Sequence, residues 1–223
     1  MRVWLIGALL MLLVAAVVRP LLFPRPASLG GNRFPWITMT ILLVAVLVLG
    51  WFEWRWRQVQ YEAADAVRTL TGRADAEVEC QRSGAQLVFL GDESGRVEWV
   101  QGDERNTGNV AWLDHETCAE LAAWLRSDRS SPTIEQVTAV HVLTHEAIHV
   151  SGHRNEAMAE CVAMAFDARL AELLGATAEQ AAVLAQRYAE QVYPRMPSSY
   201  RGDCAALLRS IGLTAPAGQA WPG

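Results

Sequence analysis

The chain has 223 residues, a formal net charge of -5 and four cysteines, and 52% of its residues are apolar. This length accommodates one or two domains of ordinary size. The mild acidity, with no cluster of Lys and Arg in the polar part of the sequence, argues against nucleic acid as a partner.

Two long apolar runs within residues 1–52 predict two membrane-spanning helices. Val3–Val18 ends at an Arg-Pro pair, and Ile37–Phe52 leads into a Trp-rich segment. Each run is shorter than the ~20 residues of a typical spanning helix, but flanking aromatic and arginine side chains extend its reach. The alternatives are a cleaved signal peptide for the first run, which lacks a clear small-x-small cleavage site, and a buried core helix for the second. We expect a transmembrane helical hairpin with a loop over residues 19–35.

The arginines do not settle the orientation of this hairpin, because they favour cytoplasmic termini by only a thin margin. The cysteines favour the opposite side. All lie beyond the apolar runs, are even in number and form no C-x-x-C pair, as expected for disulfides: Cys80, Cys118, Cys161 and Cys204. Of the three possible pairings we favour Cys80–Cys118 with Cys161–Cys204; four buried thiols are expected instead if the domain is cytoplasmic. We therefore expect a multi-pass protein of the cell membrane with an extracytoplasmic domain.

The rest of the chain predicts an α+β domain. Residues 53–74 predict a juxtamembrane helix and linker, 75–213 the domain itself, and 214–223 a flexible tail. Short β-branched and aromatic runs separated by glycines predict three or four strands of a small antiparallel sheet, at 77–80, 86–90, 97–100 and 109–113. The last of these is expected to be an edge strand beside a cleft, where an extended peptide could pair with it; an interior strand without such a role is the alternative.

Helix-capping residues then predict five helices. They begin after Asp114, at Ser131-Pro132, after Asn155, after Thr177 and after Asp203, and the first four end near Ser127, Val150, Leu174 and Val192. Gly152 and Gly175 follow two of these ends, as expected for residues that terminate helices.

The second of these helices contains the motif His145-Glu146-Ala147-Ile148-His149. Residues four apart lie on one face of a helix, so both imidazoles can point at one zinc ion. In an H-E-x-x-H site the glutamate acts as general base toward the water that zinc activates. The alternative is an ordinary helix with surface His and Glu, but only five histidines occur in the chain. The motif therefore predicts Zn²⁺ bound by His145 and His149, with Glu146 as catalytic base.

A third ligand is expected from the helix that follows. Glu156 and Glu160 are four residues apart, and a tight turn at Gly152 would fold their helix back against the first. We expect Glu156 to bind zinc and Glu160 to accept the N–H of a zinc-bound histidine. The reverse assignment stays open, as does a role of either acid as a solvated surface residue.

The segment His145–Glu160 resembles the gluzincin class of zincin metallopeptidases, in which H-E-x-x-H is followed by N-E-x-x-x-[D/E]. The resemblance implies Glu156 as ligand and Glu160 as the acid that holds the first histidine. The sequence departs from the class in its short connection of six residues. The spacing through Gly152 also resembles metzincins, except that Asn155 stands where they have a third histidine. The stretch Cys80–Cys204 is similar to uncharacterised actinobacterial membrane or secreted proteins with this motif, an Ala-Glu-Cys continuation and four cysteines.

Two further histidines and three tyrosines are candidates near the site. His141 and His153 extend the histidine series and could contact the ligands or hold a second metal, although ordinary helix-surface histidines are the simpler interpretation. Tyr200 is the preferred donor to the oxyanion of a tetrahedral intermediate, ahead of Tyr188 and Tyr193, with packing as the alternative for each.

These patterns predict a membrane-anchored zinc metallopeptidase that hydrolyses peptide bonds of a peptide or protein substrate. The alternative is a non-catalytic binding or sensory membrane module in which zinc is structural; four protein ligands around the metal would favour it. An intramembrane protease is disfavoured, because the motif helix is polar and distant from both apolar runs.

Overall fold

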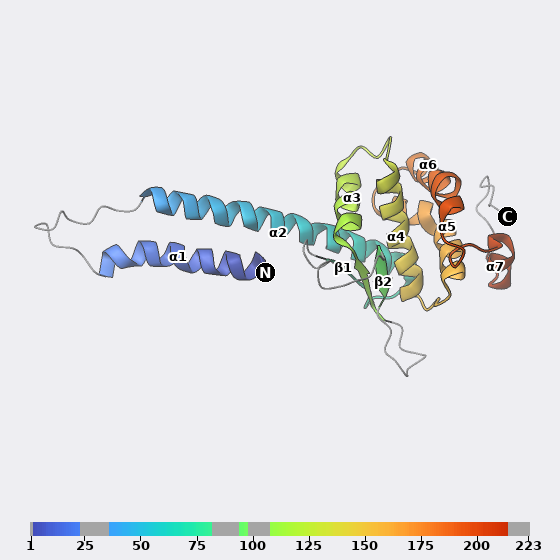
Figure 1. Ribbon diagram of the computed structural model, residues 1–223, viewed down its shortest axis with the longest axis horizontal. Helices are drawn as coiled ribbons and strands as arrows, with labels where there is room; N and C mark the ends of the chain where they lie inside the picture. Colours follow the sequence, from blue (N-terminus) through green and yellow to red (C-terminus); the bar gives the residue numbers. More distant parts are fainter. Residues whose placement is uncertain (1, 23–35, 82–93, 98–107, 214–223) are drawn as a thin grey trace, which may run out of the picture. The chain divides into compact units, whose positions relative to one another are not determined.

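The computed structural model describes residues 2–22, 36–81, 94–97 and 108–213, and shows a mixed α+β protein that is mostly helical (Figure 1). The chain divides into two compact units, residues 1–58 and 59–223. The elements are α1 (Arg2–Leu22), α2 (Trp36–Thr71), β1 (Glu77–Cys80), β2 (Gly95–Val97), β3 (Val110–Leu113), α3 (His115–Arg126), α4 (Ile134–Val150), α5 (Glu156–Leu173), α6 (Ala178–Arg187), a π-helix (Tyr188–Val192), a 3-10 turn (Tyr193–Arg195) and α7 (Cys204–Ser210).

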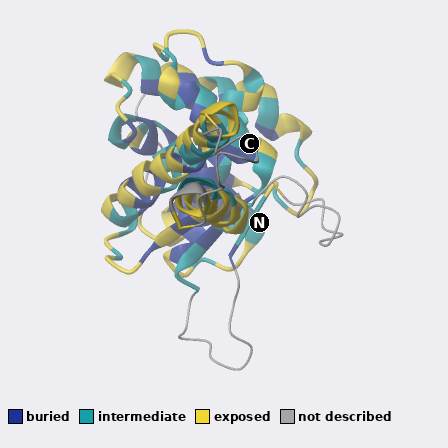
Figure 2. Cartoon of the chain, turned by 90° about the vertical axis from the view of Figure 1, so that its left-hand side faces the viewer, coloured by how far each residue is buried: buried dark blue, intermediate teal, exposed yellow. Residues whose placement is uncertain are grey.

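The first unit contains α1 and the apolar part of α2. Among the described residues, α2 is the one helix both long and apolar enough to cross a membrane; the apolar stretch of α1, Trp4–Arg19, is shorter. Large apolar side chains on both helices are exposed, and Figure 2 colours the exposed residues of the chain yellow. The expected loop over 19–35 is wrong at its start, because α1 continues to Leu22. The fixed φ of proline is compatible with a helix, so a proline in the sequence does not by itself mark the end of one. Residues 23–35 lie outside the described ranges.

The second unit begins with the polar end of α2. The expected juxtamembrane helix is the C-terminal part of α2, which continues from the apolar run without a break and ends at Thr71. Its buried side chains are small or β-branched: Val59, Ala63, Ala64, Ala66 and Val67. Arg73, two residues beyond the helix end, donates a hydrogen bond to the carbonyl oxygen of Val150 over 2.9 Å. The polar end of α2 is thereby part of the second unit.

The sheet has three described strands in the order β1-β3-β2 and is mixed, which corrects the antiparallel prediction. β1 pairs with β3 in parallel, with Val78 opposite Ala111, whereas β2 pairs with β3 antiparallel, with Gly95 opposite Leu113. A parallel pair requires a long connection, and the segment between β1 and β3 is long enough to supply it and contains β2. The expected strand at 86–90 and residues 98–100 of the expected strand at 97–100 lie outside the described ranges.

β3 is the central strand of the described sheet, so the expectation of an edge strand at 109–113 is wrong. The edge beside the helices is β2, which packs against α4 as Figure 1 shows. Strand β2 was expected two residues later, at 97–100. Alternate residues of β1 and β3, among them Cys80 and Leu113, point into the interior.

Side-chain caps fix the ends of the helices that carry the site. Asp114 accepts a hydrogen bond from the backbone N–H of Thr117 at the start of α3. Helix α4 begins at Ile134 rather than at Pro132, because Thr133 and Gln136 form a capping box that satisfies two backbone donors at once. Gly152, with a φ of 114°, follows the end of α4 and lets the chain turn tightly into α5.

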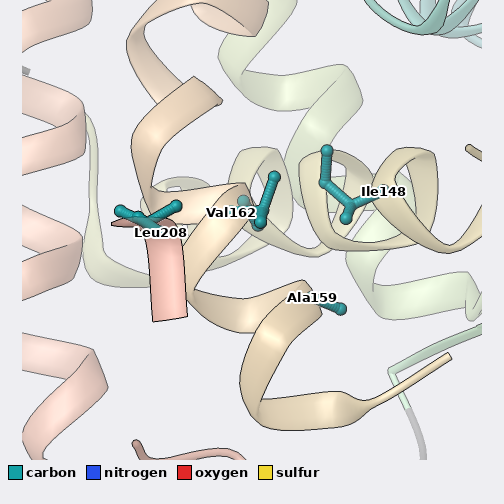
Figure 3. Packing of buried hydrophobic residues seen from close by; sticks show 5 residues of the cluster. Ile148, Ala159, Val162 and Leu208 are labelled. Carbon is teal, nitrogen blue, oxygen red and sulfur yellow. The ribbon is translucent and has the colours of Figure 1, made fainter. Parts of the chain in front are cut away.

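Helices α4 and α5 run side by side and form the centre of the second unit. Ile148 of α4 belongs to a buried apolar cluster that also contains Ala159 and Val162 of α5 and Leu208 of α7 (Figure 3). Small residues on α5, Ala159 and Ala163, are fully buried and allow the two helices to approach closely. Close approach of these two helices is what brings the glutamates of α5 to the histidines of α4.

Two disulfides join Cys80 to Cys118 and Cys161 to Cys204, the pairing that the sequence analysis favoured. The first ties β1 to α3 and the second ties α5 to α7. The bridged cysteines are 38 and 43 residues apart, so in the chain-entropy model each bond contributes roughly 4 kcal/mol to stability.

Candidate metal centre

His145 and His149 lie one turn apart on α4 and are both buried, with exposed fractions of 6% and 5%. Their Nε2 atoms are 2.9 Å apart, so the two rings converge on one point as the helical spacing predicts. Convergence of two imidazole nitrogens on one point is the arrangement expected of a pair of metal ligands.

Glu156 completes a group of three donors. It is the first residue of α5, and Asn155 caps the helix by accepting a hydrogen bond from the N–H of Met158. Its Oε2 lies 3.1 Å from Nε2 of His145 and 3.4 Å from Nε2 of His149. Neighbouring ligand atoms of a tetrahedral zinc site, each ~2.1 Å from the metal, are about 3.4 Å apart. The group therefore has the spacing and the chemistry of a site that could hold a metal ion.

The other nitrogen of each ring is oriented by the protein. Nδ1 of His149 lies 2.6 Å from the carbonyl oxygen of His153, and Nδ1 of His145 lies 3.1 Å from Oε2 of Glu160. A carbonyl oxygen and a carboxylate both require a donor, so each Nδ1 carries the hydrogen. Each Nε2 is therefore the nitrogen that would bind a metal at the common point, and in His145 it would first lose the hydrogen that it shares with Glu156.

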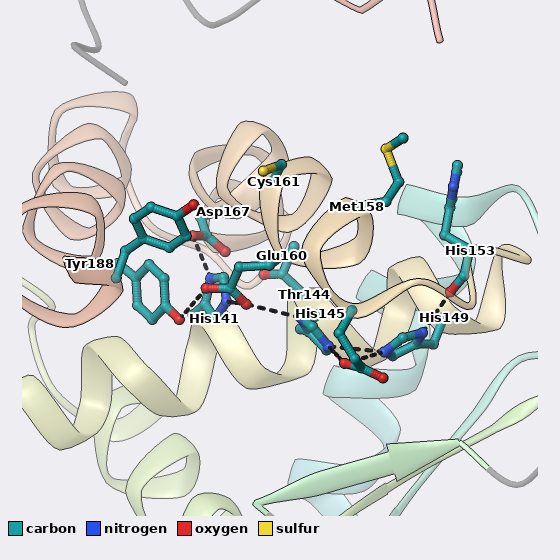
Figure 4. Close-up of polar contacts among 12 residues, drawn as sticks. His141, Thr144, His145, His149, His153, Met158, Glu160, Cys161, Asp167 and Tyr188 are labelled. Atoms are coloured by element: carbon teal, nitrogen blue, oxygen red, sulfur yellow. Dashed lines mark hydrogen bonds and ion pairs between the residues drawn. The ribbon is translucent and has the colours of Figure 1, made fainter. Parts of the chain in front are cut away.

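Glu160 lies at the centre of a second set of contacts, on the Nδ1 side of His145 (Figure 4). Its Oε2 is also 3.1 Å from Nε2 of His141, and its Oε1 accepts a 2.7 Å hydrogen bond from the hydroxyl of Tyr188. Nδ1 of His141 in turn lies 2.9 Å from Oδ2 of Asp167. We call His141, Glu160, Asp167 and Tyr188 the inner network; all four are buried.

Charge and burial oppose each other in setting the pKa values of His141 and Glu160, and act together on Tyr188. Burial lowers the pKa of His141, but the carboxylates of Asp167 and Glu160 outweigh it and raise that pKa to about 10. Burial raises the pKa of Glu160, yet the charge of His141 and three hydrogen bonds hold it well below its ordinary value. Burial, together with the charge of Glu160, raises the pKa of Tyr188. The network therefore consists of an imidazolium, ionised Glu160 and a neutral phenol near neutral pH.

The ligand candidates have perturbed pKa values as well. A hydrogen bond with His145 lowers the pKa of Glu156. Burial and then the neighbouring charge of His145 lower the pKa of His149. For His145 burial is outweighed by the hydrogen bonds with Glu156 and Glu160, which raise its pKa to about 9. A metal ion would have to displace that proton, because a coordinating histidine is neutral.

A cavity of about 410 Å³ opens in front of the three donors. Glu146, which is 4% exposed, lies on the wall of this cavity next to Gly95 of β2. An added Cβ on Gly95 would lie 2.6 Å from Oε1 of Glu146, so the strand passes directly over this carboxylate. Tyr200 lines the same cavity, and its ring centre is 5.8 Å from that of His145.

Comparison with protein-family models, with curated proteins and with solved structures finds no match to this chain. The chemistry of the site must therefore be inferred from its geometry.

The structure brings together the residues singled out from the motif, with Glu156 and Glu160 on opposite nitrogens of His145. His153 contributes a backbone carbonyl, and its ring has no part in the donor group. Tyr193 lies away from the cavity and contacts Gly202 and Cys204. Residues 109–113, expected beside the cleft, do not line it; β2 does.

Asp167 and Gly95 had no predicted role in the site, and Tyr188, a lesser candidate for oxyanion donor, binds Glu160 instead. Asp167 lies seven residues after Glu160, two helical turns along the same face of α5, so helical spacing could have indicated it. His141 stands one turn before His145 on the face of α4 that meets α5, and burial of that face turns an ordinary histidine into an ion-paired one.

Proposed function

We propose that this protein is a membrane-anchored zinc metallopeptidase of zincin type, similar to gluzincins, that hydrolyses peptide bonds. The observation that carries the proposal is the convergence of two imidazole Nε2 atoms and one carboxylate oxygen within 3.4 Å of one another. Two nitrogens and one oxygen on a cavity wall form a donor set typical of catalytic zinc, which leaves a further position for water or substrate.

Zinc, when bound there, supplies a Lewis acid that polarises a carbonyl group and lowers the pKa of water. His145, His149 and Glu156 would hold it. Both acids line the cavity, but the Glu156 side chain is 42% exposed and contacts Nε2 of His145, whereas Glu160 is 1% exposed and contacts Nδ1, so Glu156 is suited to this role. A metal site closed by both acids is disfavoured, because Glu160 contacts the nitrogen of His145 that points away from the donor group. This geometry weighs against the purely structural zinc module.

Glu146 is the proposed general base. It is adjacent to His145 in sequence and lies on the cavity wall, so its carboxylate can take a proton from the attacking water and deliver it to the leaving amine. Tyr200, which lines the same cavity, is the proposed donor to the oxyanion.

Strand β2 is the proposed docking edge for an extended substrate. The backbone N–H of Asp114 donates to the carbonyl of Ser94, so Ser94 exchanges hydrogen bonds with β3, and its neighbour Gly95 does not. The N–H and C=O of Gly95 therefore point away from β3. We propose that a peptide pairs with this edge of β2, whose residues line the cavity together with Glu146 and the three donors.

Two observations support the proposed location. Two disulfides favour an oxidising, extracytoplasmic compartment for the second unit. The apolar α2 supports anchoring in a membrane. We propose that the shorter apolar stretch of α1 forms a second span, which would make the protein multi-pass.

The proposal is tested on the full-length chain purified in detergent. Zinc content and cleavage of a mixed peptide library are measured for the wild type, for Glu146→Gln and for the control Glu172→Gln, a partly exposed residue on α5 that lies outside the cavity lining. We expect one zinc per chain in all three proteins, and cleavage lost in Glu146→Gln alone. Zinc retained with wild-type cleavage in Glu146→Gln would eliminate the mechanism, and a wild type without zinc would eliminate the proposal.

A further inference from the structure

The inner network contains a buried ion-paired histidine that the proposed reaction does not use. His141 is fully enclosed at 2% exposure, and each of its ring nitrogens faces a carboxylate oxygen, Oδ2 of Asp167 at 2.9 Å and Oε2 of Glu160 at 3.1 Å. Placing such a group in the interior is costly unless its charge is balanced on both sides. The two carboxylates of Asp167 and Glu160 provide this balance for His141.

The hydrogen-bond partners of His141 define the charge of its ring. A carboxylate oxygen accepts and does not donate, so both nitrogens of His141 must carry hydrogens, and the ring is an imidazolium. Glu160 then accepts one hydrogen from His141, one from Nδ1 of His145 and one from the hydroxyl of Tyr188. Three donors and a neighbouring positive charge keep Glu160 ionised despite its burial.

Tyr188 also fixes His141 in place. The two rings stack with centres 3.4 Å apart and an interplanar angle of 12°. Tyr188 begins the π-helix that follows α6, and π-helical turns are concentrated at functional sites. The ring thus braces His141 while its hydroxyl binds Glu160, and both actions converge on the same carboxylate.

We propose that His141 and Tyr188, supported by Asp167, are positioning residues that hold Glu160 as the acceptor of the His145 Nδ1 hydrogen and thereby set the affinity of the site for zinc. This inference rests on the proposed zinc site. Glu160, held in this position, fixes the orientation of the His145 ring and makes Nε2 a better donor to the metal. Without His141 or the Tyr188 hydroxyl, Glu160 loses a partner and its hold on His145 weakens.

A second metal ion is the competing interpretation of the same contacts. His141, His145 and Glu160 offer three donor atoms close enough to one another to hold one. An ion there would have to replace the hydrogens between Glu160 and the two rings, and would make His145 bridge two metals. The number of zinc ions per chain distinguishes the two interpretations.

The test uses Tyr188→Phe, which removes the hydroxyl and preserves the stacked ring, on the full-length chain in detergent. Tyr193→Phe is a matched control. Like Tyr188, Tyr193 is buried, but its hydroxyl contacts Gly202 and Cys204 rather than Glu160. His141→Gln is the second variant. Zinc affinity is measured by competition with a chromophoric chelator, and the visible absorption spectrum of the Co²⁺-substituted protein reports ligand geometry.

We expect one zinc per chain in the wild type, and binding ~10- to 100-fold weaker in Tyr188→Phe and His141→Gln with an altered cobalt spectrum. Tyr193→Phe should match the wild type in both measurements. Wild-type affinity and spectrum in Tyr188→Phe and His141→Gln would overturn the inference, and so would two zinc ions per wild-type chain. If the wild type cleaves peptide with one zinc while these variants bind zinc normally, the inference fails and the proposed function stands. Absence of zinc from the wild type defeats both.

Discussion

Substitution of Gly95 by alanine should reduce peptide cleavage without removing the metal. The new Cβ would lie 2.6 Å from Oε1 and 2.9 Å from Cγ of Glu146, and 2.9 Å from Cγ1 of Val142. Ordinary contacts between such atoms are about 3.5 Å or longer, so the groups must separate by nearly 1 Å. Displacement of a catalytic group by ~1 Å can cost about 100-fold in rate, and overpacking of this kind costs roughly 1–3 kcal/mol in stability.

The assay compares kcat, zinc content and thermal unfolding of Gly95→Ala with the wild type and with Gly50→Ala. Gly50 lies in α2 with no atom within 4 Å of an added Cβ, so its substitution controls for the loss of a glycine. We expect kcat to fall about 100-fold in Gly95→Ala with zinc still bound, since Glu146 is not a proposed ligand. Wild-type kcat in Gly95→Ala would show that the position of Glu146 beneath β2 does not matter. Loss of zinc together with activity would show that β2 shapes the donor group itself.

Three further outcomes follow from the contacts of the site. Glu156→Gln should bind zinc at least ~10-fold more weakly than the wild type in chelator competition, because an amide oxygen is a poorer donor than a carboxylate; unchanged affinity would remove Glu156 from the ligand set. In the metal-free protein His141 faces Asp167, Glu160 and Tyr188, and its pKa is raised to about 10. The preference of the folded state for protonated His141 stabilises the fold fully below the unfolded pKa of ~6.5, and this stabilisation is lost as the pH rises through about 10. The unfolding free energy of the wild type should therefore decline across this window more steeply than that of His141→Gln, by about 1.4 kcal/mol per pH unit, and parallel profiles in urea denaturation would contradict it. Replacing Cys161 and Cys204 together by serine should lower stability by roughly 4 kcal/mol, and a change below ~1 kcal/mol would show that the bridge between α5 and α7 does not restrain the unfolded chain.

Much of the local structure could be predicted because it depends on neighbouring residues. Asp114, Asn155 and Thr177 cap the expected helices, since a cap involves only the three or four residues that follow it. The same holds for His145 and His149, whose convergence is a property of one helix. Thr133 was missed as a cap because the Ser131-Pro132 pair offered a plausible earlier start, although only Thr133 has a glutamine three residues on.

The errors concern contacts between distant segments. The parallel pairing of β1 with β3 depends on how the intervening chain returns, which no local pattern specifies. The ion pair between His141 and Asp167 joins residues 26 apart on two helices. Their partnership depends on the rotation of α4 against α5, which small residues such as Ala159 and Ala163 permit but do not by themselves define. Tyr188 binds Glu160 over a separation of 28 residues through the π-helical turn, which capping and periodicity do not reveal.

The central claim is that two histidines of α4 and Glu156 of α5 bind zinc and leave a position for the reaction. Zinc K-edge X-ray absorption of the purified full-length chain tests it most directly. The structure predicts a four-coordinate ion with two imidazole ligands and two oxygens at about 2.0–2.1 Å, one oxygen from Glu156 and one from solvent. A chain without zinc, or a zinc ion bound by sulfur or by three or more imidazoles, would contradict the account.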